Sequence, residues 1–278
     1  MKCKPTENRT TEPAPHYVVT ISGSDSSGGA GMQTDNRAIL AAGAFPLNVI
    51  TAVTLQTPDG VIAVRCLPAT FVREQLQTLL QAYPVAAIKS GMLGNVAITR
   101  QVADVLSYFP QIPYVLDPVL CATSGHPLLD RAGIALMREH LMPRATLTTP
   151  NLDELAILAK MELPGNKSRF AAGRKLARDT GRPLLLKGGH HVGPHSRDWL
   201  LYPDESRQSF SARRVDSINT RGTGCALSAL IAARLARGDL LETAIAYAKR
   251  KLNHTLRAQA RRDWRGPGPA MFNDKTVQ

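Results

Sequence analysis

The chain has 278 residues, of which 44% are hydrophobic and 20% charged, and its formal net charge is +12 at pH 7. This length fits one large α/β domain or two small ones, and no apolar run approaches the roughly 20 residues of a membrane span. The cysteines (Cys3, Cys66, Cys121 and Cys225) are scattered without a Cys-x-x-Cys pair, which argues against a cysteine-built zinc site and favours a reducing cytoplasm.

Residues 1–16 are polar and charged, and we expect them to form a disordered tail rather than a signal peptide. Beyond them, short apolar β-rich runs alternate with helical patterns. The runs that predict strands lie at residues 17–22, 47–55, 85–88, 114–116, 145–149 and 183–187. A first helical pattern follows residues 23–31, runs through Ala42 and is closed by Gly43. Further helical patterns cover residues 68–83, 95–108, 131–140, 152–160, 168–180 and 227–236. Residues 199–202 and 208–215 are typical of antiparallel strands added at the end of a sheet.

This alternation predicts an α/β fold: a mostly parallel central sheet flanked by helices on both faces, with a few antiparallel strands at one edge. We expect one domain over residues 17–262 and a C-terminal tail over residues 263–278. Polar clusters follow the predicted strands directly. Because ligands bind beyond the carboxyl ends of such strands, we expect these clusters to converge on one rim. They are residues 23–31, Gln56, 89–92, Asp117, 151–154 and 187–190.

A glycine-punctuated turn at residues 219–226 opens the predicted helix 227–236. Gly222 and Gly224 let the backbone approach a ligand, and the first N–H groups of a helix lack partners within it. Such a turn favours anionic oxygen, most plausibly phosphate, and could leave the Cys225 thiol partly ionised. Alone the pattern is weak, because Gly-x-Gly before a helix is common and the Gly-Lys-Ser/Thr of a P-loop is missing.

The same rim carries groups suited to phosphoryl transfer, which depends on positioning and on neutralising charge. Asp117, Asn151 and Glu154 supply hard oxygens of the kind that Mg²⁺ takes, and Lys187 could neutralise a phosphate oxygen. Each residue alone has a structural alternative: Asp117 and Asn151 as helix caps, Lys187 as a surface lysine, and Met92 as a core filler.

Basic residues outnumber acidic ones between residues 244 and 278, which leaves a nucleic-acid partner open. They are not interleaved with aromatic residues, and no nucleic-acid motif is present. A solvated basic face of a helix is the favoured interpretation.

In its ordered motifs the chain resembles the bacterial hydroxymethylpyrimidine/phosphomethylpyrimidine kinases of thiamine synthesis, which belong to the ribokinase-like superfamily. The likeness runs from about residue 17 to 252. Its motifs lie at residues 22–31, 49–56, 89–93, 116–119, 122–125 with 127–129, 149–154, 187–190 and 222–225. The resemblance implies a ribokinase-like fold, and ATP- and Mg²⁺-dependent phosphorylation of 4-amino-5-hydroxymethyl-2-methylpyrimidine and then of its monophosphate. It also implies a homodimer, with no specific nucleic-acid partner.

The resemblance also implies a role for individual residues. Gln56 would read the pyrimidine, because its amide presents a donor and an acceptor together. Gly23, Asp25 and Met92 would line the same pocket. Asn151 and Glu154 would form a magnesium and phosphate motif, Asp117 would order the metal, Lys187 would hold the ATP phosphates, and Gly222, Thr223 and Gly224 would form the anion hole.

Cys225 stands where most ribokinase-like sugar kinases have an aspartate base. It could accept the hydroxymethyl proton or only position the oxyanion, and both roles stay open.

Two other functions remain as alternatives. The nearer one is a pyridoxal kinase of the same superfamily, against which Gln56 and Met92 argue. The other is a non-catalytic protein on the same fold that binds a thiamine-pathway ligand or nucleic acid.

Overall fold

The computed structural model describes residues 15–57, 60–122, 125–188, 193–264, 268 and 270–272. A nine-stranded sheet runs through the whole molecule in the order β3-β2-β1-β4-β5-β6-β7-β8-β9. The strands are β1 (Tyr17–Asp25), β2 (Phe45–Thr57), β3 (Gly60–Cys66), β4 (Val85–Ser90), β5 (Tyr114–Leu116), β6 (Leu147–Thr148), β7 (Leu184–Leu186), β8 (His195–Leu201) and β9 (Arg207–Arg213).

The strands from β2 to β7 pair in parallel, and antiparallel strands close both edges of the sheet. The edge made by β8 and β9 is the predicted one. The other edge, where β3 forms a hairpin with β2, is missing from the prediction. No side chain of β3 is fully buried, so this strand lacks the apolar run that indicates a buried strand.

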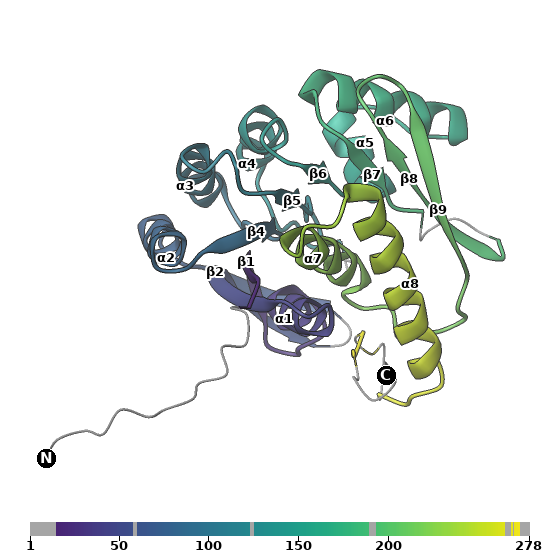
Figure 1. Ribbon diagram of the computed structural model, residues 1–278, viewed down its shortest axis with the longest axis horizontal. Coiled ribbons are helices and arrows are strands. Elements are labelled where there is room, and N and C mark those ends of the chain that lie inside the picture. Colours follow the sequence, from purple (N-terminus) through teal and green to yellow (C-terminus); the bar gives the residue numbers. More distant parts are fainter. Residues whose placement is uncertain are drawn as a thin grey trace, which may run out of the picture.

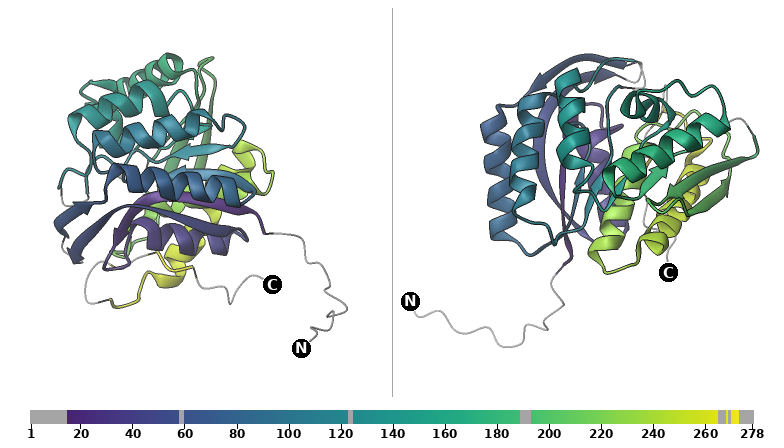
Figure 2. Two further views of the ribbon diagram at one scale, coloured as in Figure 1. Left: turned by 90° about the vertical axis from the view of Figure 1, so that its left-hand side faces the viewer. Right: turned by 90° about the horizontal axis from the view of Figure 1, so that it is seen from above.

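Helices cover both faces of the sheet (Figure 1, Figure 2). Every predicted helix has a counterpart, although residues 131–140 form α4 followed by a π-helical turn, η1. The helices are α1 (Gly31–Ala41), α2 (Ala69–Ala82), α3 (Val96–Ser107), α4 (Arg131–Leu136), η1 (Met137–Leu141), α5 (Leu152–Ala159), α6 (Asn166–Thr180), α7 (Thr223–Ala236) and α8 (Leu241–Gln259).

Two hydrophobic cores lie on opposite faces of the sheet. Val19 and Ile21 of β1 join the core under α2, α3, α4, α5 and α6, whereas Val18 joins the core under α1, α7 and α8. Because successive strand residues point to opposite faces, a strand covered by helices on both sides must be apolar throughout. The continuous apolar runs of the sequence arise from this burial.

Individual helix ends follow the expected chemistry. The Asn95 side chain caps α3 by accepting a hydrogen bond from the Ile98 N–H (2.9 Å). Gly43, just after α1, has a left-handed φ of 76°, which is common for glycine at this position. No helix among the described residues is both long and apolar enough to cross a membrane.

The predicted tail over residues 1–16 lies outside the described residues except for Pro15 and His16. The predicted boundary at residue 262 also stays a prediction. Past it, the Gly268 N–H donates to Asn219 Oδ1 (2.9 Å) and Ala270 is fully buried. These described parts of the C-terminal segment therefore pack against the body of the protein.

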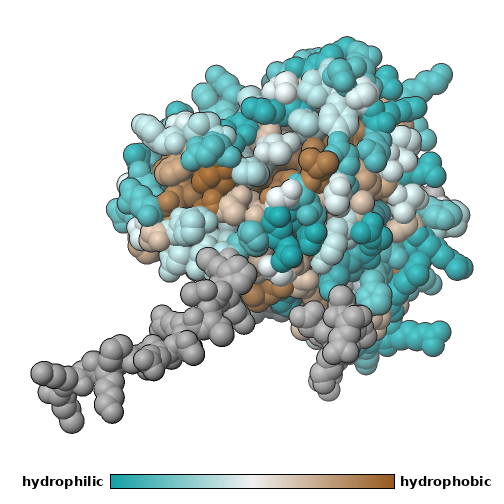
Figure 3. Space-filling view, viewed as in Figure 1, coloured by the Kyte–Doolittle hydropathy of each residue, from teal (hydrophilic) through white to brown (hydrophobic). Residues whose placement is uncertain are grey.

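The sequence interpretation expects the basic residues of α8 to be solvated, and only some of them are. In Figure 3 the side of the molecule over α8 and β9 is mostly hydrophilic, and Arg250 is exposed. Lys249 differs, because its side chain is buried in an ion pair with Asp198 (2.7 Å).

Candidate active site

A cavity of about 990 Å³ opens at the carboxyl ends of the parallel strands. Side chains or backbone from the ends of β1 and β2 and from the segments after β4, β5, β6 and β7 reach it, together with the turn before α7. The convergence on one rim is therefore confirmed. All the residues singled out from the sequence line this one cavity: Gly23, Asp25, Gln56, Met92, Asp117, Asn151, Glu154, Lys187, Gly222, Thr223, Gly224 and Cys225.

The turn that opens α7 is packed tightly against the loop after β1. Gly222 caps the helix with a left-handed φ of 70°, and a Cβ there would overlap the carbonyl oxygen of Gly29. Gly31 has φ 56°, and a Cβ on it would overlap the Gly23 carbonyl oxygen. Only glycine fits both the conformation and the space at these positions. The N-terminus of α7 therefore lines the cavity with backbone atoms that no side chain of Gly222 or Gly224 covers.

Lys187 lies at the centre of the polar end of the cavity. Its ammonium donates to Asp117 Oδ1 (2.8 Å) and lies 3.7 Å from Glu154 Oε2. A Cβ on Gly224 would be 3.3 Å from Lys187 Nζ, so the lysine also touches the α7 turn. The cluster thus joins a cation, two carboxylates and a helix N-terminus, which is a suitable setting for phosphate.

Ionisation of this cluster is set by burial and by mutual charge. Burial would raise the pKa of Asp117, but the ammonium groups of Lys187 and Lys89 outweigh it and hold that pKa below its ordinary value. Burial raises the pKa of Glu154 to about 7, helped by the Asp117 carboxylate and opposed by Lys187. Burial lowers and the two carboxylates raise the pKa of Lys187, with a net rise, so the lysine stays charged.

Asn151 does act as a helix cap, one of the structural alternatives. Its Oδ1 accepts from the Glu154 N–H (2.8 Å), and Glu154 Oε2 accepts from the Asn151 N–H (2.7 Å), which makes a capping box at the start of α5. Asp117 is instead held by the hydroxyl groups of Thr149 (3.1 Å) and Ser228 (3.3 Å) in addition to Lys187. The capping box fixes Glu154 with its carboxylate towards the lysine.

The surroundings of Cys225 disfavour ionisation of its thiol. Burial raises the pKa of this thiol to about 12, and the carboxylates of Asp117 and Asp35 add to the rise. The Lys89 ammonium and a hydrogen bond from the Gly31 N–H oppose it without prevailing. The structure therefore argues against the expected partial ionisation in the free protein, because burial of the thiol, which the sequence does not show, outweighs the favourable effect of Lys89.

Lys89 is a buried cation beside this thiol that sequence reasoning left without a role. Its ammonium binds both oxygens of Asp35 (2.9 and 2.8 Å), and both side chains are fully buried. Asp35 also accepts from the hydroxyl groups of Thr20 (2.6 Å) and Ser22 (3.1 Å). Asp35 lies in a helical pattern, so only the tertiary structure pairs it with Lys89.

The opposite end of the cavity is largely apolar. Met92 packs on Gly23, whose Cβ would be 2.9 Å from the methionine sulfur. Met92 also forms a small hydrophobic cluster with Ala52 and Leu128, against which Val119 packs. Gln56 lines this end, with its Oε1 accepting from the Thr54 hydroxyl (3.3 Å). A flat ring with polar edges would fit between such groups.

Asp25 lines the cavity but uses its oxygens to order the loop after β1. Oδ1 accepts from the Ser27 N–H (2.8 Å), and Oδ2 accepts from the N–H groups of Gly29 (3.0 Å) and Ala30 (2.8 Å). Arg221 lies 3.4 Å from Oδ2 and donates to the Ser27 hydroxyl (3.1 Å). This aspartate therefore joins the loop to the α7 turn.

A further part of the cavity, beyond the α7 turn, is missing from the sequence prediction. Lys249 of α8 donates to Asp198 (2.7 Å) and Ser196 (3.0 Å) of β8, and Asp198 accepts from the N–H of Gly188 (2.8 Å), the neighbour of Lys187. No strand-end signal marks these residues. The apolar lining here comes from residues that the structure brings together: Val215, Ile218, Leu252 and Leu256.

Asp117 and Glu154 are the residues that could hold a divalent cation. Their oxygens are hard ligands, and the same lysine ammonium lies beside both. Within the described ranges no group of three or more His, Cys, Asp and Glu side chains forms a metal cluster. Mg²⁺ usually takes one or two carboxylates and completes its shell with water and substrate phosphates, so this pair fits that ion.

A profile of the phosphomethylpyrimidine kinase family matches residues 25–270. The chain belongs to the phosphomethylpyrimidine kinase family. It is 41% identical over 254 residues to the thiamine biosynthesis multifunctional protein of Corynebacterium efficiens, a match that covers 91% of this chain and 34% of that protein. It is 37% identical over 235 residues to the hydroxymethylpyrimidine/phosphomethylpyrimidine kinase of Haemophilus influenzae, covering 84% and 87%.

A solved relative is the pyridoxal kinase of Bacillus subtilis in an ADP complex, with a TM-score of 0.84 and 28% identity over 92% of this chain and 98% of that one. These matches confirm a ribokinase-like α/β fold and membership of a family named for a kinase. The chain spans only about a third to a half of the multifunctional relatives it matches, 34% and 51% of their lengths.

Proposed function

We propose that this chain transfers the terminal phosphoryl group of ATP to the hydroxymethyl oxygen of 4-amino-5-hydroxymethyl-2-methylpyrimidine, and a second one to the resulting monophosphate, in thiamine biosynthesis. Family membership supports the reaction class. The observation that carries the proposal is the shared cavity, which is lined both by Gln56 and Met92 and by the polar cluster around Lys187.

Recognition of the heterocycle falls to the apolar end. The Gln56 amide offers a donor and an acceptor side by side, which match the ring nitrogen and exocyclic amine of an aminopyrimidine. Met92 would pack on the ring face, and Gly23 would leave room for that contact. In this arrangement the hydroxymethyl group points towards the α7 turn.

Charge neutralisation falls to the other end. Lys187 and the N–H groups of Gly222, Thr223 and Gly224 would bind the phosphoryl oxygens, which become more charged as the group transfers. Asp117, Glu154 and, through the capping box, Asn151 would hold Mg²⁺, directly or through water. When bound, this ion supplies charge neutralisation to the nucleotide phosphates. The nucleotide base would use the slot lined by Ile218 and Leu252.

The role of Cys225 follows from its protonated state. As a proton acceptor it must first lose its own proton, which a pKa of about 12 opposes in the free protein. As a donor, the thiol could instead hold the acceptor oxygen or a phosphoryl oxygen in place. The second reaction needs little help from a base, since its acceptor is already an ionised phosphate.

Release of ADP tests the proposal. We expect ADP release that depends on both the pyrimidine alcohol and Mg²⁺, and a second turnover on the monophosphate. Mass spectrometry of the products would assign each phosphoryl group. Absence of ADP release with every pyrimidine and pyridine alcohol would overturn the assignment as a kinase of this substrate class.

Pyridoxal is the alternative acceptor, and the 28% identity to the Bacillus subtilis pyridoxal kinase supports it. The higher identities, 41% to a thiamine biosynthesis multifunctional protein and 37% to a hydroxymethylpyrimidine/phosphomethylpyrimidine kinase, favour the pyrimidine. Measuring kcat/KM for both alcohols side by side separates them. A value for pyridoxal above that for the pyrimidine would reverse our order.

We further infer a homodimer in a reducing compartment such as the cytoplasm. Val53, Leu55 and Ile62 of the β2–β3 hairpin are 47%, 58% and 61% exposed, which is unusual for apolar side chains at a sheet edge and supports an interface there. The reducing compartment is supported by Cys66, Cys121 and Cys225, which are free thiols rather than disulfides. Light scattering should give a dimer mass, and a monomer mass for Leu55→Lys; a wild-type monomer would refute the dimer.

A further inference from the structure

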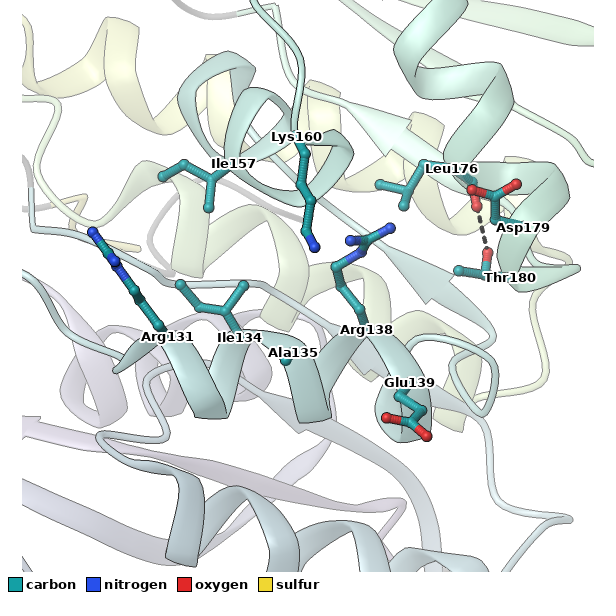
Figure 4. Close-up of a pocket in the computed structure, with 10 residues that line it drawn as sticks. All are labelled: Arg131, Ile134, Ala135, Arg138, Glu139, Ile157, Lys160, Leu176, Asp179 and Thr180. Carbon is teal, nitrogen blue, oxygen red and sulfur yellow. Dashed lines mark hydrogen bonds between the residues drawn. The ribbon is translucent and has the colours of Figure 1, made fainter.

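A second cavity, of about 560 Å³, lies between the α4–η1 segment and the helices α5 and α6. It shares no lining residue with the active-site cavity. In Figure 4 Arg138 rises from η1 and Lys160 descends from the end of α5, so that their charged ends approach each other across the gap. Ile134, Ile157 and Leu176 form the apolar walls. Its volume is in the range of small-molecule sites.

The cations of this cavity lack acidic partners, unlike those of the active site. There, Lys89, Lys187 and Lys249 are each paired with an aspartate at 2.7–2.8 Å. Throughout the described ranges, neither Arg138 nor Lys160 forms an ion pair or side-chain hydrogen bond. The Arg138 Nε is shielded from solvent and has no partner there either.

The acidic residues near the cavity do not compensate this charge. Asp179 is paired with Lys175 (2.5 Å) on the same helix. The Glu139 side chain points away from the gap in Figure 4 and is 75% exposed. Arg131 adds a further cation at the rim. Like charges that face one another repel, and a bound anion relieves this repulsion.

The backbone holds one of these cations in an unusual conformation. Lys160 ends α5 in the left-handed region, with φ 53°, where glycine is the common residue. A side chain there costs stability relative to glycine. In Figure 4 that ammonium enters the cavity.

We propose that this cavity binds a small organic phosphate. The phosphate group lies between Arg138 and Lys160, and the apolar body packs against Ile134, Ile157 and Leu176. Arg and Lys are suited to the phosphate by charge and by their donors. The site is separate from the reaction and does not depend on the substrate proposed above.

The test uses methyl NMR of the full chain with ¹³C-labelled isoleucine δ1 methyl groups, assigned with Ile→Val variants. Ile134 and Ile157 report on this cavity, and Ile218 reports on the active site. The probes are phenyl phosphate, inorganic phosphate and phenol. We expect saturable shifts of Ile134 and Ile157 with phenyl phosphate, weaker binding of inorganic phosphate, and no effect of phenol at equal concentration.

Matched variants distinguish binding in this cavity from non-specific attraction of the anion to the positively charged surface. Arg138→Gln with Lys160→Gln should weaken phenyl phosphate binding at Ile134 and Ile157 at least tenfold and leave the Ile218 response unchanged. Lys167→Gln with Arg250→Gln removes the same charge from exposed positions and should change neither. Shifts confined to Ile218, or shifts at Ile134 that survive the first pair of substitutions, would overturn the proposal. Equal binding of inorganic phosphate would refute the apolar subsite.

Discussion

Cys225 combines a position at a helix N-terminus with an environment that keeps its proton on. The N-terminus and Lys89 favour the thiolate, whereas burial and the carboxylates of Asp117 and Asp35 disfavour it more strongly. Burial of the thiol, with a smaller contribution from the two carboxylates, thus outweighs Lys89 and raises the pKa of this residue. Removing the sulfur therefore asks whether the reaction needs proton transfer or only contact.

Cys225→Ala separates proton acceptance from positioning by its effect on the two proposed acceptors. If the sulfur accepts the hydroxymethyl proton, kcat on the alcohol falls by about 10²-fold or more, and kcat on the monophosphate falls much less. Cys225→Asp should then keep appreciable activity on the alcohol. Steady-state ADP release with each acceptor measures both. Full activity of Cys225→Ala on the alcohol would remove proton acceptance by this residue.

The buried Glu154 carboxyl is expected to lower the stability of the folded protein at neutral pH, although the proposed function needs it there. Its pKa is about 7 in the folded protein against an ordinary value of 4.5. The folded state therefore binds the proton more tightly than the unfolded state, and the wild type loses stability as pH rises from about 4.5 to about 7.

In metal-free buffer, Glu154→Gln should be more stable than the wild type at pH 8, by on the order of 2 kcal/mol, and equal to it below pH 4.5. Glutamine preserves the capping box. Urea denaturation across pH measures the difference, and the same variant should lose kinase activity. Glu139→Gln, which removes the same charge from a side chain that is 75% exposed, is the control. A Glu154→Gln protein less stable than the wild type at pH 8 would contradict this account.

At the scale of secondary-structure elements, the loop after β1 and the start of α7 form one unit. The Gly222 backbone touches Gly29, and Asp25 joins the loop to Arg221. On the other side, Asp198 of β8, paired with Lys249 of α8, accepts a hydrogen bond from the N–H of Gly188, the residue after Lys187. Elements distant in the chain thereby position the phosphate-binding groups.

Gly222→Ala should disturb this unit beyond the strain of its backbone. Gly238, at the other end of α7, also has a positive φ (87°), but nothing lies within 4 Å of a Cβ there. Gly238→Ala should therefore lose only about 1 kcal/mol. Gly222→Ala should lose clearly more and also raise the KM for ATP. Equal denaturation midpoints for the two variants would show that the Gly29 contact is unimportant.

Lys249→Met should leave the buried Asp198 carboxylate without its partner and destabilise the protein by about 3–5 kcal/mol. Adding Asp198→Asn should recover much of this loss, because the amide oxygen can still accept from Gly188. The exposed Arg250→Met is the control. Denaturation midpoints of the single and double variants form a double-mutant cycle. No recovery in the double variant would mean that the ion pair is not what Lys249 contributes.

At the scale of the whole molecule, one continuous sheet carries the residues that line both ends of one cavity. A ligand at either end stabilises the folded state by about 2.7 kcal/mol at 100 times its dissociation constant. The pyrimidine alcohol and a non-hydrolysable ATP analogue should therefore each raise the Tm, and together raise it roughly additively. Mutual exclusion, in which one ligand abolishes the shift due to the other, would mean that they compete for one end.

Much of the fold was predictable because helices and buried strands leave local periodic patterns. The parallel strands from β2 to β7 carry apolar runs, and the capping residue Asn95 precedes its helix in the sequence as in the structure. The hairpin strand β3 was missed because its side chains are all partly exposed and give no such run. Lys249 was interpreted as part of a solvated face because helix periodicity does not reveal a distant aspartate.

The sequence by itself determined the alternation of strands and helices, the loops that follow the strands, and the glycine turn before α7, since each depends on residues close in the chain. Only the tertiary structure decided which groups remain free to act. In the folded protein, the oxygens of Asp25 accept hydrogen bonds within the loop after β1. Folding also places Lys187 beside two carboxylates and raises the pKa of the Cys225 thiol by burying it. Ion pairing and desolvation depend on groups that only folding brings together.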